Sequence, residues 1–225
     1  RGTDIYGVSN TSITVPTSPP TAVTNTNFLT TFTNAGIIDH TMRNNLESEG
    51  NTRISGQQTK FGTGSIYFDG TTDRIVLPHS ELQQLNTGQF TVEFFVYLSS
   101  TGTSGFMGNY EGWYFQYIGG ELEFALSSGA IIEEAWSPST NTWYHLAVTR
   151  DSSNDIRIFV DGTQLGSSVN STANFRHDTN DFQIGDIGTN TRIFAGGYMD
   201  EIRITKGVAR YTSNFTAPTK AFANR

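Results

Sequence analysis

Apolar and polar residues alternate with a period of two over most of the chain between residues 65 and 205. Such alternation places successive side chains on opposite faces of a β-strand. No long segment keeps apolar residues at the 3.6-residue period that a buried helix face needs. The clearest alternation is in the segment 90–98, in which one face carries only the apolar residues Phe90, Val92, Phe94, Val96 and Leu98. The pattern therefore predicts an all-β chain with 90–98 as a central strand.

Shorter alternating runs predict the remaining strands, because clusters of Gly, Asn, Asp, Ser and Thr bound each run. The expected strands are 65–68, 74–77, 106–109, 113–118, 121–126, 130–135, 143–150, 156–160, 163–167, 182–184 and 197–205. An Asp-Gly pair at 161–162 is typical of a tight hairpin turn. A single helical turn is expected over 80–86, and the stretch 34–60 is expected to be irregular.

Composition narrows the class of protein further. Aromatic residues make up 12% of the 225 residues, which favours strands, and a chain of this length fits one all-β sandwich. The net charge of −7 argues against a nucleic-acid partner, which requires clustered Lys and Arg. No apolar run approaches the ~18 residues that span a bilayer, so membrane insertion is not expected. The sequence contains no cysteine, which excludes disulfides and thiolate metal sites.

The chain divides into three expected parts. Residues 1–27 are expected to be a linker with the tail of a preceding repeat, 28–211 the sandwich, and 212–225 a C-terminal linker. Within the first part, 7–27 is rich in Thr, Ser, Pro and Asn, which favours extended backbone outside a packed sheet.

The two ends of the chain resemble each other. Residues 1–6 align with 206–211, and residues 13–17 align with 215–219 in the same order. Two matches in one order indicate a piece of a tandem array. The alternative is that two Thr- and Pro-rich ends are alike through composition alone.

Five segments in the same order carry a resemblance to a known family. They are 60–70 followed by Asp73, 90–96, 143–150 (Trp-Tyr-His-Leu-Ala-Val-Thr-Arg), 158–162 (Ile-Phe-Val-Asp-Gly) and 198–204. They resemble the laminin-G-like domains of the concanavalin A-like lectin and glucanase superfamily. The resemblance implies a jelly-roll sandwich of two antiparallel sheets. Residues 205–211 followed by 215–219 resemble the versions found in bacteriophage structural proteins.

Asp200 is a candidate metal ligand. Counting back by two from Ile204 through Ile202 places it on the apolar face of its strand. Because a buried carboxylate needs a partner, the alternatives are a metal ion, backbone N–H groups or a distant Arg. The resemblance implies a structural calcium site that joins an early loop to the last strand through Asp39 and Asp200. The family often has small residues after Asp39, whereas this chain has His-Thr-Met-Arg, so Arg43 is an alternative to the ion.

Aromatic residues beside polar ones are candidates for sugar binding, since a pyranose ring stacks on an aromatic face while polar groups accept its hydroxyl protons. The candidates are Asn109, Tyr110, Glu111, Trp113, Tyr114 and Trp136. The favoured alternative is that aromatic residues such as Trp113 and Tyr117 fill the core of the sandwich.

Catalysis has no support in the sequence. Glu121 and Glu123 have the alternate spacing that glycosidases use, but they lack the acid order of the superfamily's hydrolases, so a solvated strand is the preferred interpretation. Glu133 and Glu134 are adjacent and therefore point to opposite faces of a strand. The four histidines show no zinc-site or nucleophile motif.

These observations predict a non-catalytic recognition or adhesion module, repeated in an extracellular virion protein of a phage such as a tail fibre or a capsid decoration. Its expected partner is cell-surface carbohydrate, with calcium as a structural ion. The alternative is a structural spacer or assembly domain that contacts other virion proteins. A glycan hydrolase is the least favoured interpretation, and self-association into a homo-oligomer is left open.

Overall fold

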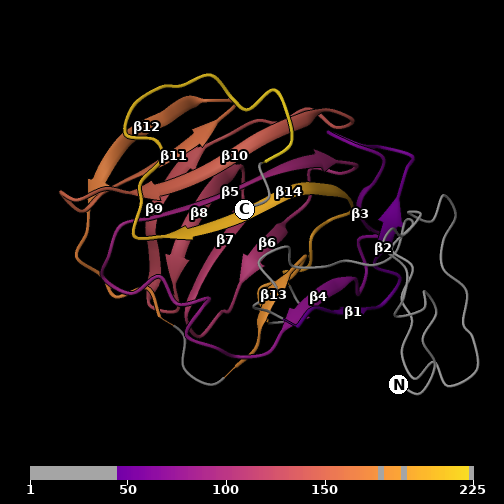
Figure 1. Cartoon of the computed structure of the whole chain (residues 1–225), viewed down its shortest axis with the longest axis horizontal. Helices are drawn as coiled ribbons and strands as arrows, with labels where there is room; N and C mark the ends of the chain where they lie inside the picture. The colour runs from indigo at the N-terminus through magenta and orange to yellow at the C-terminus, as the bar shows by residue number, and fades with distance from the viewer. Residues whose placement is uncertain (1–44, 177–179, 189–191, 223–225) are drawn as a thin grey trace, which may run out of the picture. The chain divides into compact units, whose positions relative to one another are not determined.

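Two antiparallel sheets of seven strands each make up the described part of the chain, which in this computed structural model comprises residues 45–176, 180–188 and 192–222 (Figure 1). In spatial order, sheet A contains β1 (Glu47–Glu49), β4 (Arg74–Leu77), β13 (Phe182–Ile184), β6 (Ser104–Gly108), β7 (Trp113–Ile118), β8 (Glu121–Leu126) and β9 (Gly129–Ala135). Sheet B contains β12 (Thr163–Asn170), β11 (Asp155–Val160), β10 (Trp143–Arg150), β5 (Phe90–Leu98), β14 (Gly197–Lys206), β3 (Ser65–Phe68) and β2 (Arg53–Ser55). The predicted all-β, concanavalin A-like jelly-roll class is confirmed. Among these residues there is no helix long and apolar enough to cross a membrane.

Most strands begin and end where the sequence predicts. The predicted bounds agree with β3, β4, β5, β7, β8, β10 and β13, and the ends of the other predicted strands shift by at most three residues. β1 and β2 were not predicted, because each has only three residues, none of them buried, and offers no alternation to read. The expected helical turn over 80–86 is a turn closed by a hydrogen bond from Gln83 N to Ser80 O of 3.4 Å.

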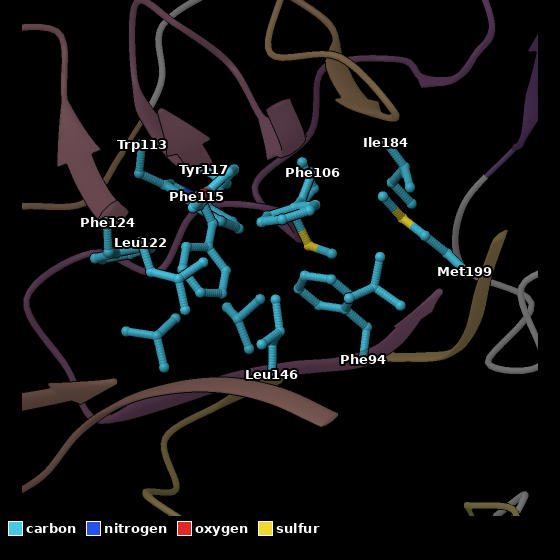
Figure 2. Close-up of a cluster of buried hydrophobic side chains, with 14 of the residues drawn as sticks. Phe94, Phe106, Trp113, Phe115, Tyr117, Leu122, Phe124, Leu146, Ile184 and Met199 are labelled. Carbon is cyan, nitrogen blue, oxygen red and sulfur yellow. The ribbon is translucent and has the colours of Figure 1, made fainter. Parts of the chain in front are cut away.

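The core lies between the two sheets, where the inward-facing side chains of both meet (Figure 2). Phe94 of β5 packs against Phe106 and Phe115 of sheet A, with ring centroids 5.4 and 5.9 Å apart. All three rings are fully buried. Because an aromatic side chain removes ~150–250 Å² from water at about 25 cal/mol per Å², contacts of this kind are the main stabilisation of the sandwich.

A β-bulge interrupts β14 beside the central strand. Asp200 pairs with Phe95 and Arg203 pairs with Glu93, so three steps along β14 match two along β5. Glu201 occupies the left-handed region, with φ of 52°. An extra residue of this kind bends the strand and reverses the alternation of its side chains.

The bulge changes the face on which Asp200 lies. Ile204 and Met199 point toward the core side, but Asp200 shares the outer face of sheet B with Phe95. The expectation that Asp200 lies on the same face as Ile204 is therefore wrong, because counting by two holds only in a strand without an inserted residue.

The segment after β14, drawn in yellow in Figure 1, packs on the outer face of sheet B. Tyr211 stacks on Phe215 with ring centroids 3.5 Å apart, and Phe215 N donates to Gly162 O over 2.8 Å. A side chain at Gly162, where φ is 81°, would collide with the Phe215 carbonyl. Farther along, Phe222 lies 3.8 Å from the Arg203 guanidinium. Residues 212–222, for which the sequence indicates a linker, therefore contact the sheet.

Candidate functional site

A pocket of about 310 Å³ lies at one end of sheet A, where β6 turns into β7 and the chain enters β13. This volume is at the lower end of the range for small-molecule sites, roughly 300–1,000 Å³. Its lining is mostly polar: Asn109, Tyr110, Glu111, Asn180, Asp181, Gln183 and Gly188. We call it the Tyr110 pocket.

Asn109 fixes the shape of the Tyr110 pocket. Its backbone N–H donates to Trp113 O over 2.9 Å and its carbonyl accepts from Gly112 N over 2.8 Å, which closes the β6–β7 turn. Its side-chain oxygen accepts from Glu111 N over 2.9 Å, and its Nδ2 donates to Asp181 O over 3.0 Å. The residue is 2% exposed. Because all of these bonds are buried or partly buried, Asn109 joins the turn rigidly to the segment before β13.

Tyr110 is the aromatic side chain that the pocket leaves accessible, at 36% exposure. Its ring stacks on Tyr114, with centroids 5.4 Å apart and an interplanar angle of 24°. The Arg192 guanidinium lies 5.2 Å from the Tyr110 ring and 5.8 Å from the Tyr114 ring, and it donates to Gln116 Oε1 over 2.9 Å. Burial, followed by the charge of Glu123, raises the pKa of Tyr114, so that ring stays neutral. Tyr110 is thus a supported aromatic platform.

Oxygen acceptors surround this platform. Glu111 accepts a hydrogen bond from Asn180 Nδ2, and Asp181 Oδ1 accepts one from His79 N over 3.0 Å. Each carboxylate has capacity for further hydrogen bonds, since two oxygens offer about four acceptor positions. The Gln183 Oε1 atom is buried and has no hydrogen-bond partner among the described residues. The arrangement can bind a small ligand that offers an apolar ring face and several O–H or N–H donors.

Three of the six predicted sugar-binding residues meet at the pocket, namely Asn109, Tyr110 and Glu111. Trp113 instead points into the core, fully buried, with its Nε1 donating to Gln83 O over 2.8 Å (Figure 2). Trp136 is 8% exposed and packs between aromatic neighbours of both sheets. Tyr114 is 3% exposed because Tyr110 covers it. None of these three rings presents a free face, and the core interpretation is confirmed for Trp113 and Tyr117, which both belong to the buried cluster.

The other four lining residues were not predicted from the sequence. Asn180, Asp181, Gln183 and Gly188 are about 70 residues away along the chain, and they reach the pocket because β13 pairs with β6, with Gln183 opposite Gly108. The Asn-Asp pair before a short strand was a visible signal for a polar loop. The sequence did not show which segment lies beside this loop in space, because that follows only from the order of the strands in sheet A.

Asp200 has the backbone partners that the sequence left open as an alternative to a metal. Its Oδ2 accepts from Lys60 N over 3.0 Å and from Phe61 N over 3.1 Å, and its Oδ1 accepts from Glu201 N over 2.9 Å. Burial raises the pKa of Asp200, and these N–H groups offset part of that effect. They supply the compensation that a half-buried carboxylate requires.

Of the two ligands predicted for calcium, the described residues include only Asp200. No cluster of three or more His, Asp or Glu side chains suited to a metal occurs in the ranges 45–176, 180–188 and 192–222. The second predicted ligand, Asp39, and the alternative cation, Arg43, lie outside the described residues. Calcium therefore stays a prediction that depends on Asp39.

The paired acids on β8 face outward from sheet A. Glu123 is half-buried, lies opposite Gln116 and Glu133, and accepts a hydrogen bond from Gln116 Nε2. Glu121 is exposed at the start of the strand. Neither residue lines the Tyr110 pocket.

Sequence comparison places this fold among known domains. A family model described as the concanavalin A-like lectin/glucanases superfamily matches residues 69–210. A search of curated proteins by sequence found no match.

Solved structures with the same fold include domains of toxins and of an enzyme. The binding domain of Paraclostridial Mosquitocidal Protein 1 is 16% identical, with a TM-score of 0.52 over 70% of this chain and 44% of that one. The ligand-binding domain of botulinum neurotoxin serotype D in complex with N-acetylneuraminic acid is 12% identical, with a TM-score of 0.54 over 77% and 43%. Domain 4 of an extracellular arabinanase from Geobacillus stearothermophilus, in complex with arabinotriose, is 18% identical, with a TM-score of 0.53 over 73% and 82%. The chain thus spans less than half of the toxin domains that it matches.

Proposed function

The chain belongs to the concanavalin A-like lectin/glucanases superfamily, and from this premise we propose that the domain is a non-catalytic carbohydrate-recognition module that binds a sugar in the Tyr110 pocket. The observation that carries the proposal is the exposed Tyr110 ring, held by Tyr114 and Arg192 beside a set of oxygen acceptors. Two structures of the same fold are complexes with sugars, arabinotriose and N-acetylneuraminic acid, which supports carbohydrate as the ligand class.

The geometry suits a sugar because sugars have two kinds of surface. The C–H face of a pyranose is apolar and stacks on a tyrosine ring, whereas the ring edge carries hydroxyl groups that need acceptors. Tyr110 supplies the first, and Glu111, Asp181 and Gln183 supply the second. A single site of this size is expected to bind weakly, with a dissociation constant on the order of 1 mM to 10 μM. Repeated copies would convert weak single-site binding into useful avidity.

Binding without catalysis is the favoured activity. The acid pair of β8 lies outside the pocket, and the paired His145 and Glu93 are fully buried. A glycosidase needs two carboxyl groups that flank one accessible bond, and the two carboxylates of the Tyr110 pocket, Glu111 and Asp181, do not occur in the acid order of the superfamily's hydrolases. Recognition requires only the stacking surface and the acceptors that the Tyr110 pocket has.

The setting of the module is also part of the proposal. The ending 205–211 followed by 215–219 resembles phage structural proteins, which supports an extracellular virion protein that attaches to cell-surface glycans. Labelling of purified phage particles with an antibody against the domain tests the setting, and an antibody that labels no particle would contradict it. A calcium ion held by Asp39 and Asp200 would tie an early loop to the last strand.

A glycan array probed with the purified chain tests the proposed function. We expect binding to a restricted set of glycans, reduced roughly two- to tenfold in Tyr110→Ala because stacking contributes about 0.5–1.5 kcal/mol and the pocket loses its platform. The matched control is Tyr67→Ala, which removes a half-buried tyrosine of β3 outside the pocket. A folded chain that binds no glycan, or equal losses in the two variants, would contradict the proposal and favour a spacer or assembly domain.

A further inference from the structure

The charged side chains in the described lining of the Tyr110 pocket are all acidic. Its lining contains two carboxylates, Glu111 and Asp181, and none of the described lining residues is a Lys, Arg or His. The whole chain has the same sign, with a net charge of −7. A negative ligand would therefore enter against the field of the pocket and of the protein.

The cation that contacts the Tyr110 ring is already engaged. Arg192 lies over the rings of Tyr110 and Tyr114, and its Nη1 donates to Gln116 Oε1 over 2.9 Å. To pair with a carboxylate on a ligand, Arg192 would have to leave the contact that supports the Tyr110 ring. The cation therefore acts on the platform, and its single charge offsets at most one of the two carboxylates of the lining.

The hydrogen-bonding groups of the pocket also disfavour a carboxylated ligand, because they are acceptors. Gln183 Oε1 is a buried acceptor without a partner among the described residues. Glu111 and Asp181 are acceptors only when they are ionised. A ligand hydroxyl that donates to Gln183 would satisfy a group that is otherwise costly to bury, whereas a ligand carboxylate would bring further acceptors.

From the charge and the acceptors together we infer that the Tyr110 pocket selects neutral sugars and rejects sugars that carry a carboxylate. This inference rests on the proposed function and specifies its ligand class. It separates the chain from the fold relative whose structure contains N-acetylneuraminic acid, a carboxylated sugar. The expected preference is about tenfold or more at low salt, and it shrinks at 1 M salt, where the Debye length falls to ~3 Å.

Matched polymers test the inference. Binding is measured by affinity electrophoresis and by pull-down on three pairs that differ in the carboxylate: methyl-esterified polygalacturonate and polygalacturonate, β-1,4-mannan and β-1,4-polymannuronate, and β-1,4-glucan and β-1,4-polyglucuronate. EDTA is present, so that no divalent cation bridges two carboxylates. We expect the neutral member of at least one pair to bind about tenfold more tightly than its carboxylated partner.

Variants that remove a single charge test whether the carboxylates of the pocket cause the preference for neutral sugars. Glu111→Gln and Asp181→Asn should each raise the ratio of carboxylated to neutral binding severalfold, whereas Glu121→Gln, an exposed acid outside the lining, should leave that ratio at the wild-type value. Carboxylated polymers that bind as well as their neutral partners, or an unchanged ratio in both pocket variants, would overturn this inference and leave the proposed function standing. A folded chain that binds none of the six polymers and no arrayed glycan would overturn both.

Discussion

Tyr211 donates its hydroxyl hydrogen to Glu93 Oε2 over 2.8 Å and joins the C-terminal segment to the central strand of sheet B. The carboxylate is fully buried, and it is also contacted by Arg203 at 2.7 Å and by His145 at 3.2 Å. Burial opposes the charge on Glu93, but the His145 hydrogen bond, Arg203 and Tyr211 outweigh it and hold the pKa of Glu93 below its usual value. The segment after β14 therefore completes a buried polar cluster on the outer face of the sheet.

Replacing Tyr211 with Phe should destabilise the domain by about 1.5–3 kcal/mol, the usual contribution of a hydrogen bond to a charged group. Denaturation in urea with a fluorescence readout measures the change. Tyr97→Phe is the matched control, because its hydroxyl makes an exposed 3.3 Å contact with Asn141. A loss no larger than in the control would show that the C-terminal segment does not depend on this bond.

Acid should weaken the domain through Glu93. Because folding lowers the pKa of this carboxyl from its ordinary value of 4.5, its contribution is fully present above about pH 4.5 and is lost as the pH falls through the lower folded pKa. We expect the free energy of unfolding to decline in this acidic window. Glu93→Gln should show a shallower decline, and parallel pH profiles for the two proteins would contradict the assignment.

Arg150 should be among the side chains most sensitive to substitution. It is fully buried at the end of the core, and it donates to the carbonyl oxygens of Gly88, Ala173 and Asn86 over 2.9, 2.7 and 2.8 Å. Arg150→Met leaves the Gly88 and Ala173 carbonyls without the donor that Arg150 supplies, whereas Asn86 O still accepts from Phe175 N over 3.0 Å, and the change should cost about 2–5 kcal/mol.

Arg150→Lys tests the same cluster more narrowly. A lysine keeps the charge but lacks the planar fork that reaches three carbonyls, so it should rescue only part of the loss. Arg53→Met, at an exposed position of β2, should stay within about 0.5–1 kcal/mol of the wild type. Equal stability of the wild type and Arg150→Met would contradict the role given to these bonds.

The calcium prediction is tested by thermal unfolding with calcium and with EDTA. A cation that joins Asp39 to Asp200 should raise the Tm, because an ion at 100 times its dissociation constant adds about 2.7 kcal/mol. Asp39→Asn should abolish the rise and leave the Tm in EDTA nearly unchanged. A wild-type Tm that calcium leaves unaltered would contradict the calcium prediction.

The sequence by itself determined the β-sandwich. Alternation in 90–98 identified the central strand and its core face, because burying one face of a strand imposes a period of two that no helix shares. The polar groups around Asn109 and Tyr110 were visible in the same way, as an aromatic and polar turn between two strands. The sequence could not show that Trp113 is buried and Tyr110 exposed, since both are aromatic. Which ring enters the core depends on the face of the sheet to which each position points once the turn has formed.

Only the tertiary structure decided which face Asp200 occupies and which residues complete the Tyr110 pocket. The bulge at Glu201 moves Asp200 from the core face to the outer face, and it arises from pairing with β5, which leaves no local signature in a strand sequence. The pairing of β13 with β6 brings Gln183 beside the Asn109 turn from a distant part of the chain. Periodicity is a local property set by burial, whereas sheet order and register depend on contacts between segments far apart, and the functional site is built from those contacts.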